Sequence, residues 1–333
     1  MTKNAARSVW PGYGRLAVGA VAVAAVFSVP LVAGEYVRFV LLMALINVIA
    51  TTGVNLSMGY CGLVSVGHAG FVAIGAYVTT LLMVQWNVPF PVSLAAGTVA
   101  AGIAGVVIGL PALRLSPLYI AMVTFGFGQA VNYVALNWIE LTGGPNGMAV
   151  PPPTLFDDIL SNGAIYAMTA GFCLLTLWVA WNIARSRLGR AFIAIRESEI
   201  AAQSMGVKVA TYKTIAFGIG ALFGGLAGGL YAFASGYVNP DAFVFLVSIM
   251  YVTMCVAGGL GTVLGPVIGG ILLTLLPELL RPLAEYKEVL SGIVLLAFLV
   301  LMPRGLGPLI GAAIGRMTER LARPAQPREP DTA

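Results

Sequence analysis

The chain has little charge. Of its 333 residues only 9% are Asp, Glu, Lys or Arg, whereas 59% are hydrophobic and the mean hydropathy is +0.93. A soluble domain carries roughly a quarter charged residues, so this chain lacks the side chains that would cover a water-facing surface. The composition excludes a secreted or cytosolic enzyme. It indicates a polytopic membrane protein, whose fold class we predict as all-α.

Cysteine and histidine are also scarce. Cys61, Cys173 and Cys255 lie in or beside apolar runs without CxxC spacing, so they predict no disulfide framework. His68 is the single histidine and has no Cys/His cluster around it in sequence, so we expect no metal site. The two possible roles of His68 are a structural one near the start of a helix and contact with a transported solute. No GxxxxGK[ST] motif occurs, and we expect this chain to bind no cofactor.

Buried charge is missing from the apolar segments. Every Asp, Glu, Lys and Arg falls at the end of an apolar run or in a loop. Carriers driven by ion gradients commonly keep carboxylates or lysines inside the helix bundle as relays. This absence weakens an ion-coupled carrier without excluding it, because sodium can be bound by backbone carbonyls alone.

Long apolar runs are what the chain does have. A transmembrane helix needs about 20 apolar residues, and we predict ten spans, at roughly 16–33, 36–57, 66–84, 90–111, 117–138, 164–184, 212–234, 243–257, 266–281 and 288–303. The first is expected to be a retained span rather than a signal peptide. The eighth and ninth are short and could form a re-entrant pair. We expect tails at 1–15 and 304–333, the second disordered, around a transmembrane domain at 16–303.

The positive charges favour one orientation. With ten spans and a cytoplasmic N-terminus, the cytoplasmic side holds fifteen of the 18 Lys and Arg residues, as the positive-inside rule requires. They are Lys3, Arg7, Arg15, Arg114, Arg185, Arg187, Arg190, Arg196, Lys208, Lys213, Arg304, Arg316, Arg320, Arg323 and Arg328. The loop 139–163, which would face outside, has none. We therefore place both termini in the cytoplasm, and the net charge of +5 gives no support to nucleic-acid binding.

The polar residues inside the spans are neutral. Asn47, Thr51 and Asn55 are spaced four apart and share one face of a helix. They either hydrogen-bond between helices or line a path for a neutral or zwitterionic solute. The candidate path residues are Asn47, Thr51, Asn55, Ser65, His68, Thr124, Gln129 and Thr253.

Glycine is abundant, with 41 residues, and it clusters in two stretches, 58–77 and 258–270. Glycine clusters break helices at membrane depth, which is tolerated where the backbone lines a cavity. One such stretch in each half of the chain suggests an internal repeat, as many transporters have.

The loop 185–213 is the longest predicted cytoplasmic segment. Ser198 is a plausible N-cap, Glu199 suits the first turn and Gly206 suits the position after the last turn. They predict a helix of about two turns, which is marginal in water unless it packs against something. The alternative is an ordinary solvated loop anchored at the lipid headgroups.

The same loop resembles the coupling motif of ABC importer permeases, E-A-A-x-x-x-G, with Ile200 inserted after the glutamate. Further segments, NLSMGYCGLVSVGHAGFVAIGAY, LRLSPLYIAMVTFGFGQ, LTGGPNGM and VAGGLGTVLGPVIGG, resemble branched-chain amino acid ABC transporter permeases of the LivM type. The resemblance covers about 35–305. It implies that ATPase coupling falls to Arg196, Glu199, Ala201, Ala202 and Gly206.

This family resemblance implies a fold like that of type II ABC importers and a transmembrane subunit without chemistry of its own. It implies a LivH-type second permease, two ATP-binding cassette subunits and a periplasmic solute-binding protein as partners, in the cell inner membrane. The implied solutes are leucine, isoleucine and valine, with urea or short amides as alternatives. A stand-alone facilitator is the competing interpretation from the residues alone. The loop 139–163 either contacts the binding protein or is a plain surface loop.

Overall fold

The structure is a computed structural model that describes residues 34–112, 117–152, 154–155, 158–159, 161–280 and 292. Its long helices are α2 (Glu35–Val54), α3 (His68–Trp86), α4 (Phe90–Ala112), α5 (Pro117–Asn137), α7 (Asn162–Arg185), α10 (Val209–Ser235), α11 (Phe245–Gly258) and α12 (Leu264–Leu279). The π-helix Asn55–Tyr60 continues α2. Shorter helices are α6 (Ile139–Thr142), α8 (Arg187–Glu197) and α9 (Glu199–Ser204).

Seven of the described helices are long and apolar enough to cross a membrane, and Leu264–Leu279 is a shorter apolar helix. Each of the eight spans predicted between residues 36 and 281 corresponds to a helix of the structure. The prediction of an all-helical polytopic membrane protein is therefore confirmed. The predicted spans 16–33 and 288–303 and the tails 1–15 and 304–333 lie outside the described residues, apart from Gly292.

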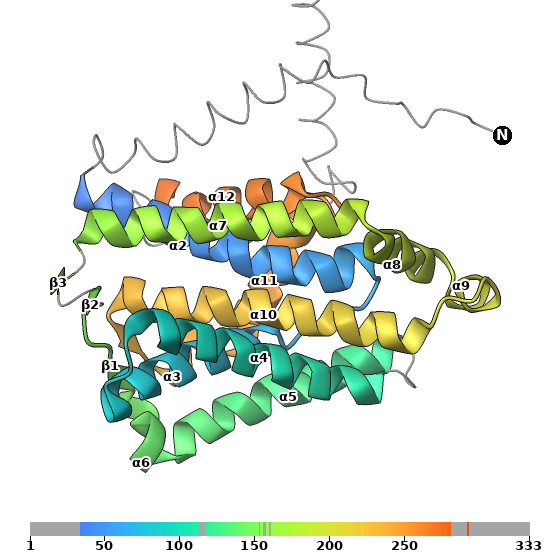
Figure 1. Ribbon diagram of the computed structural model, residues 1–333. Coiled ribbons are helices and arrows are strands. Elements are labelled where there is room, and N and C mark those ends of the chain that lie inside the picture. The colour runs from blue at the N-terminus through green and yellow to red at the C-terminus, as the bar shows by residue number, and fades with distance from the viewer. Residues whose placement is uncertain are drawn as a thin grey trace, which may run out of the picture.

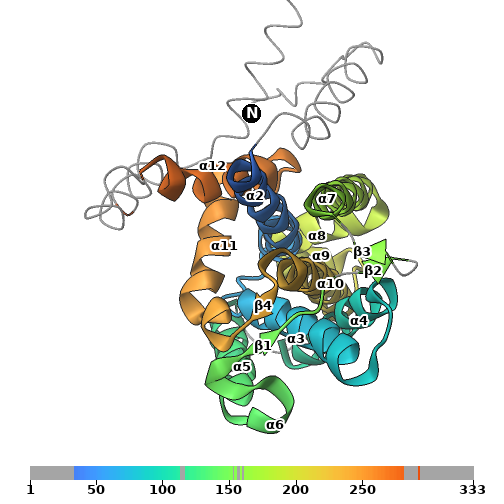
Figure 2. The same ribbon diagram turned by 90° about the vertical axis from the view of Figure 1, so that its left-hand side faces the viewer.

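The long helices run side by side along one direction (Figure 1). Viewed from one end, α2 lies among α7, α10, α11 and α12, while α3, α4 and α5 form the opposite side of the bundle (Figure 2). Met254 of α11 meets Thr51 of α2, and Thr274 of α12 meets Asn47. Because Thr262 meets Asn55, α12 runs antiparallel to α2.

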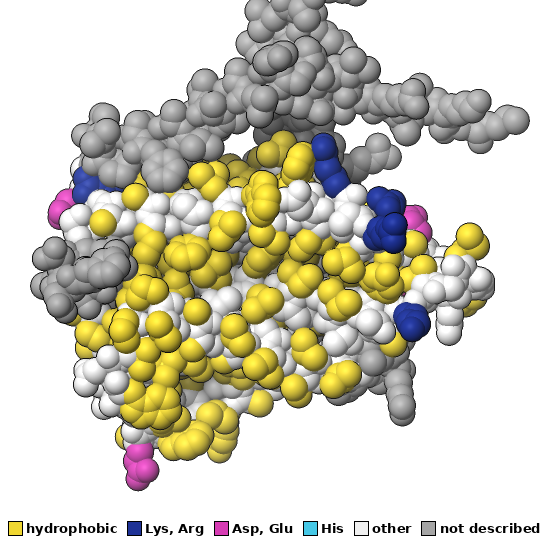
Figure 3. Space-filling view, in the orientation of Figure 1, with side chains coloured by type: hydrophobic (Ala, Val, Ile, Leu, Met, Phe, Trp, Pro, Cys, Tyr) yellow, Lys and Arg dark blue, Asp and Glu magenta, His cyan; other side chains and the backbone are white. Residues whose placement is uncertain are grey.

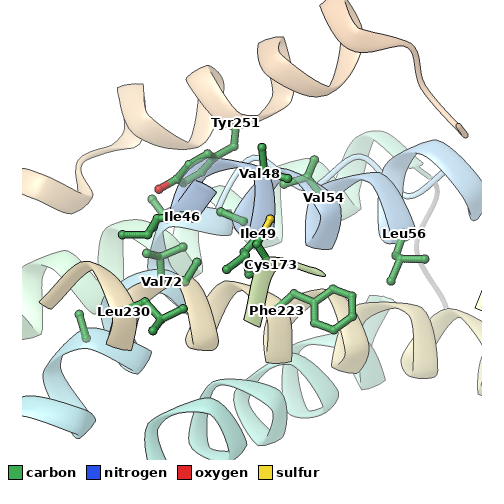
Figure 4. Packing of buried hydrophobic residues seen from close by; sticks show 14 of the residues in the cluster. Ile46, Val48, Ile49, Val54, Leu56, Val72, Cys173, Phe223, Leu230 and Tyr251 are labelled. Atoms are coloured by element: carbon green, nitrogen blue, oxygen red, sulfur yellow. The ribbon is translucent and has the colours of Figure 1, made fainter. Parts of the chain in front are cut away.

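The core is built around α2 and α10. Ile46, Ile49 and Val54 of α2 point into a buried apolar cluster that Phe223 and Leu230 of α10 complete (Figure 4). Small residues then let α10 approach its other neighbours closely. A Cβ on Gly75 of α3 would collide with the backbone of Gly225 in α10, so these two helices pack backbone against backbone.

The surface separates the sides of the bundle from its two ends. Apolar side chains cover the visible side, whereas the described Lys, Arg, Asp and Glu gather toward the ends (Figure 3). At the end that carries α8, the Arg185 guanidinium lies 4.0 Å from the centre of the Trp181 ring. Such an arrangement suits a helix end at the membrane–water interface.

The other end of the bundle carries α6 and short strands (Figure 1). The 3-10 helix Gly144–Asn146 follows α6. β1 (Met148–Ala149) then pairs antiparallel with β4 (Tyr237–Val238), and β2 (Thr154–Leu155) pairs antiparallel with β3 (Asp158–Ile159). The 3-10 helix Pro240–Phe243 leads into α11. The described residues of the loop 139–163 therefore lie at the end of the bundle remote from α9, as the predicted topology requires.

Candidate functional site

The helix pair α8–α9 projects from one end of the bundle (Figure 1). Each helix begins at a serine cap: Ser186 Oγ accepts a hydrogen bond from Leu188 N at 3.0 Å, and Ser198 Oγ accepts one from Ala201 N at 3.2 Å. A capping serine satisfies one of the free N–H groups of the first turn. The predicted N-cap at Ser198 is confirmed, and this single residue separates α8 from α9.

Gly206 ends the element as the sequence predicted. Its φ is +83°, in the left-handed region where a Cβ is unfavourable. Val207 N then donates to the carbonyl of Ala202 at 3.0 Å. The reversal turns the chain back from α9 into α10.

An ion pair between a buried lysine and an exposed glutamate fastens α9 to α10. Lys213 Nζ lies 2.5 Å from Glu199 Oε1, and the Lys213 side chain is 1% exposed while that of Glu199 is 44% exposed. Ala202 of α9 is also buried. A charge this deep in the protein is strongly destabilising without its partner, so α9 is held firmly to the inner end of α10.

The remaining face of α9 points away from the protein. Ile200 is 81% exposed and Met205 is 85% exposed. Ala201 is also exposed, whereas Ala202 faces the bundle. The two alanines of the motif therefore do not share a surface, and Ile200, the residue inserted into the motif, contributes to the exposed face instead.

Arg196 does not contribute to the exposed face of α9. Its Nη1 donates to the carbonyl of Gly59 at 2.6 Å, at the end of the π-helix, and its Nη2 lies 3.2 Å from Glu197 Oε1. Glu197 is largely exposed, and exposed ion pairs contribute little. The main contact of Arg196 is therefore with the transmembrane part of the chain.

The polar stripe on α2 is bonded to α11, α12 and the loop between them. Asn47 Nδ2 donates to Thr274 Oγ1 at 2.9 Å, and Thr51 Oγ1 lies 3.5 Å from Met254 Sδ. Asn55 Nδ2 donates to the carbonyl of Thr262 at 2.8 Å. This is the interhelical hydrogen bonding that the sequence offered as one alternative. A path-lining role for these residues stays a prediction.

Three further candidates gather where α3 begins. Thr124 Oγ1 of α5 accepts a hydrogen bond from Val66 N at 3.1 Å. His68 is buried, and its ring meets the ring of Tyr251 edge-on at 6.1 Å between centres. Within the described part of the chain, His68 Nε2 and Ser65 Oγ are buried without a hydrogen-bond partner.

The last two candidates lie on a different surface. Gln129 of α5 is exposed, and Thr253 of α11 is partly exposed. Phe125 of α5 and Phe245 of α11 meet edge-on at 4.7 Å between ring centres, so these helices are neighbours. We name the outer surface of these two helices the α5–α11 face. The structure therefore separates the eight candidates into an α2 stripe, a group at the start of α3 and the α5–α11 face.

Sequence reasoning missed the role of Lys213. The residue was counted only among the orienting charges, yet it is buried against Glu199. A lysine in the first turn of an apolar helix was the available signal, because charge is unfavourable there unless it is paired. The pairing with Glu199 cannot be read from periodicity, since a chain reversal separates the two residues.

The comparisons with known proteins agree with this architecture. The family described as "Branched-chain amino acid transport system / permease component" matches residues 36–302. The LivM permease proteins of Salmonella typhimurium and Escherichia coli are each 35% identical over 292 residues, covering 80% of this chain and 69% of theirs. The LivH protein of Salmonella typhimurium is 26% identical over 279 residues, covering 76% of this chain and 88% of its own.

No solved structure matches the chain significantly. The family match nevertheless spans every helix of the described bundle from α2 onward. The chain therefore belongs to the family of branched-chain amino acid ABC transporter permeases, and it is a transport subunit rather than an enzyme.

Proposed function

We propose that this chain is the LivM-type permease subunit of an importer for leucine, isoleucine and valine in the bacterial inner membrane. It works with a LivH-type permease, two ATP-binding cassette subunits and a periplasmic binding protein. The observation that carries the proposal is α9, a capped helix fastened to a transmembrane helix, which exposes the apolar side chains of Ile200 and, at its C-terminal end, Met205. A facilitator that works alone has no use for such an element.

The proposed docking contact is the exposed face of α9. Ile200 and Met205 extend two apolar side chains beyond the bundle, where a cleft on the ATPase subunit can enclose them. The ion pair between Glu199 and Lys213 makes α9 move together with α10. A displacement of the ATPases thereby reaches the transmembrane helices.

The proposed translocation path lies along the α5–α11 face. α5 is the least apolar and the least buried of the seven spans. It exposes Gln129, and Tyr133 is 68% exposed. An exposed amide is costly against lipid chains, which favours a second permease covering this face. The absence of fixed charge here suits a zwitterion such as leucine.

The proposed topology has ten spans with both termini in the cytoplasm and a fold like that of type II importers. The basic residues Arg185, at the end of α7, and Arg187 and Arg190, on α8, lie at the same end of the bundle as α9, which supports assigning that end to the cytoplasm (Figure 1). The loop 139–163 then faces the periplasm. Its strand pairing with β4 gives the binding protein a fixed surface to contact.

The decisive experiment changes the docking face alone. In the importer assembled with its partners, Met205→Glu places a charge where an apolar contact is expected, and we predict that the ATPase subunits no longer co-purify and that leucine uptake falls at least about tenfold. The matched control is Ile193→Glu, which also replaces an exposed apolar side chain by glutamate, but on α8. Normal uptake by Met205→Glu would overturn the docking role.

Reconstitution tests the solute and the competing interpretation. Proteoliposomes holding the full complex should accumulate leucine against a gradient only with ATP, and should not accumulate urea or a short amide. Liposomes holding this permease alone should accumulate none of them. Rapid equilibration of urea by the permease alone would instead establish a facilitator.

A further inference from the structure

The first glycine-rich stretch interrupts the bundle at residues 55–67, which we name the first break. The π-helix Asn55–Tyr60 ends there, and the last carbonyls of a helix have no following turn of the helix to bond to. Arg196 Nη1 donates to one of them, the Gly59 carbonyl, at 2.6 Å. A cation is favourable at this end of a helix because the macrodipole is negative there.

The second break, at residues 259–263, joins α11 to α12. The Asn55 side chain bonds to two backbone groups of the second break. Its Oδ1 accepts a hydrogen bond from Gly261 N at 2.9 Å, and its Nδ2 donates one to the carbonyl of Thr262 at 2.8 Å. The two breaks touch directly, because a Cβ on Gly59 would lie 2.5 Å from Gly261 N. The glycine-rich stretches of the two halves thus meet at one point.

Arg196 lies over this meeting point. A Cβ on Gly261 would lie 2.7 Å from Arg196 Nη1, and a Cβ on Gly62 would lie 2.9 Å from Arg196 Cγ. The Arg196 side chain therefore contacts both breaks. Gly62 and Gly261 leave space for it because they have no Cβ. The same residue is in the last turn of α8, one turn before α9.

We propose that Arg196 is a positioning residue that couples the docking helix to both breaks, so that displacement of α9 moves the inner ends of α2, α11 and α12 together. This rests on the proposed function, because it needs an ATPase that moves α9. α8 and α9 are joined through Ser198 alone, and a shift of this pair must either carry the two breaks with it or break the Arg196–Gly59 hydrogen bond. Arg196 thus passes the displacement of α9 to the two breaks, while Ile200 and Met205 form the contact with the ATPase.

The test measures leucine transported per ATP hydrolysed by the full importer in proteoliposomes. With Arg196→Ala, the ATPases should still co-purify and hydrolyse ATP, while leucine per ATP falls about tenfold, as loss of one charge-assisted hydrogen bond implies. Arg196→Lys keeps the charge but not the planar fork, and should restore part of the ratio. Arg190→Ala removes an exposed arginine from the same helix and should leave the ratio unchanged.

Two results would overturn the proposal. If Arg196→Ala transports as much leucine per ATP as the unmodified importer, with normal amounts of the complex in the membrane, Arg196 only stabilises the local structure. Loss of ATPase co-purification in Arg196→Ala and Arg196→Lys would make it part of the docking surface. A failure of the proposed function itself is distinguishable, because Met205→Glu would then also leave ATPase binding and uptake intact.

Discussion

The inner end of the bundle and the α5–α11 face use polar residues in opposite ways. At the inner end, Arg196, Asn55 and Glu199 each bond to a partner within this chain, at 2.6, 2.8 and 2.5 Å. On the α5–α11 face, Gln129 is exposed, and the partly exposed Thr253 donates only to the Ile249 carbonyl of its own helix, at 2.8 Å. The first set joins different elements of this chain to one another. Within the described residues, neither Gln129 nor Thr253 bonds to another helix, which favours the proposed contact with a second permease or a solute.

This difference bears on how a polar residue inside a membrane protein is interpreted. Burial of a neutral polar side chain with good hydrogen bonds indicates packing. Exposure of a similar side chain on an otherwise apolar span indicates a surface that lipid does not cover. Composition alone treats Asn55 and Gln129 alike, and their surroundings separate them.

The largest predicted effect comes from breaking the inner end at Gly206. Gly206→Pro imposes a φ near −65° where the chain needs +83°, and it removes the N–H that donates to the Gln203 carbonyl. We expect leucine uptake by the assembled importer to be abolished, with membrane insertion intact. The measurement is ATP-dependent uptake normalised to the amount of permease in the membrane.

A milder pair of variants isolates the backbone strain. Gly206→Ala should cost about 1 kcal/mol in the stability of the α9 turn and lower uptake partially. Gly171→Ala on α7 is the matched control, because its Cβ also enters open space but its φ is not positive. Equal uptake by both variants would show that the left-handed turn is not required.

The second prediction contrasts the two regions directly. Asn55→Ala leaves Gly261 N and the Thr262 carbonyl without their partner, which should cost about 1–3 kcal/mol for each group. We expect a lower Tm for the detergent-purified complex and little change in the KM for leucine. Gln129→Ala should give the reverse, an unchanged Tm and a KM raised severalfold.

These measurements distinguish the two interpretations of the polar stripe on α2, which are hydrogen bonding between helices and contact with the solute. A changed solute preference in Asn55→Ala or Thr51→Ala, at an unchanged Tm, would put that stripe in contact with the solute. In that case the contrast between partnered and outward-facing polar residues would not separate packing from transport in this protein.

Local signals made part of this architecture predictable from sequence. Apolar runs located the described spans, and Ser198 and Gly206 marked the ends of α9, because a cap bonds only three residues along the chain. The contact between Arg196 and Gly59 joins residues 137 apart, and no periodicity encodes it. For the same reason the sequence indicated that Asn47, Thr51 and Asn55 share a face but not which helices that face meets.

A third prediction uses Cys61, which is buried in the first break, as a probe of movement there. Burial raises the pKa of this thiol to about 12, with Lys213 nearby lowering it and Glu199 raising it. At pH 8 nearly all of the thiol is then protonated, whereas the thiolate is the reactive form. The resting importer should therefore resist a maleimide at Cys61.

If the breaks move with α9, turnover should change this reactivity. We expect labelling of Cys61, measured by peptide mass spectrometry, to rise severalfold when ATP, leucine and the binding protein are all present. Cys173 and Cys255 are buried within spans and serve as controls in the same molecule. Labelling that is equally slow with and without turnover would mean that the first break stays closed around Cys61 throughout transport.

The smallest predicted effect tests how α9 is held at the inner end. Ser198→Ala removes the bond to Ala201 N and should cost about 1 kcal/mol. The ion pair between Glu199 and Lys213 still fastens the helix, so uptake should fall no more than about twofold. Combining Ser198→Ala with Glu199→Gln should lower uptake by more than the two separate effects predict, because both changes release the same helix. Loss of all uptake in Ser198→Ala alone would mean that the cap, and not the ion pair between Glu199 and Lys213, holds α9 in its docking position.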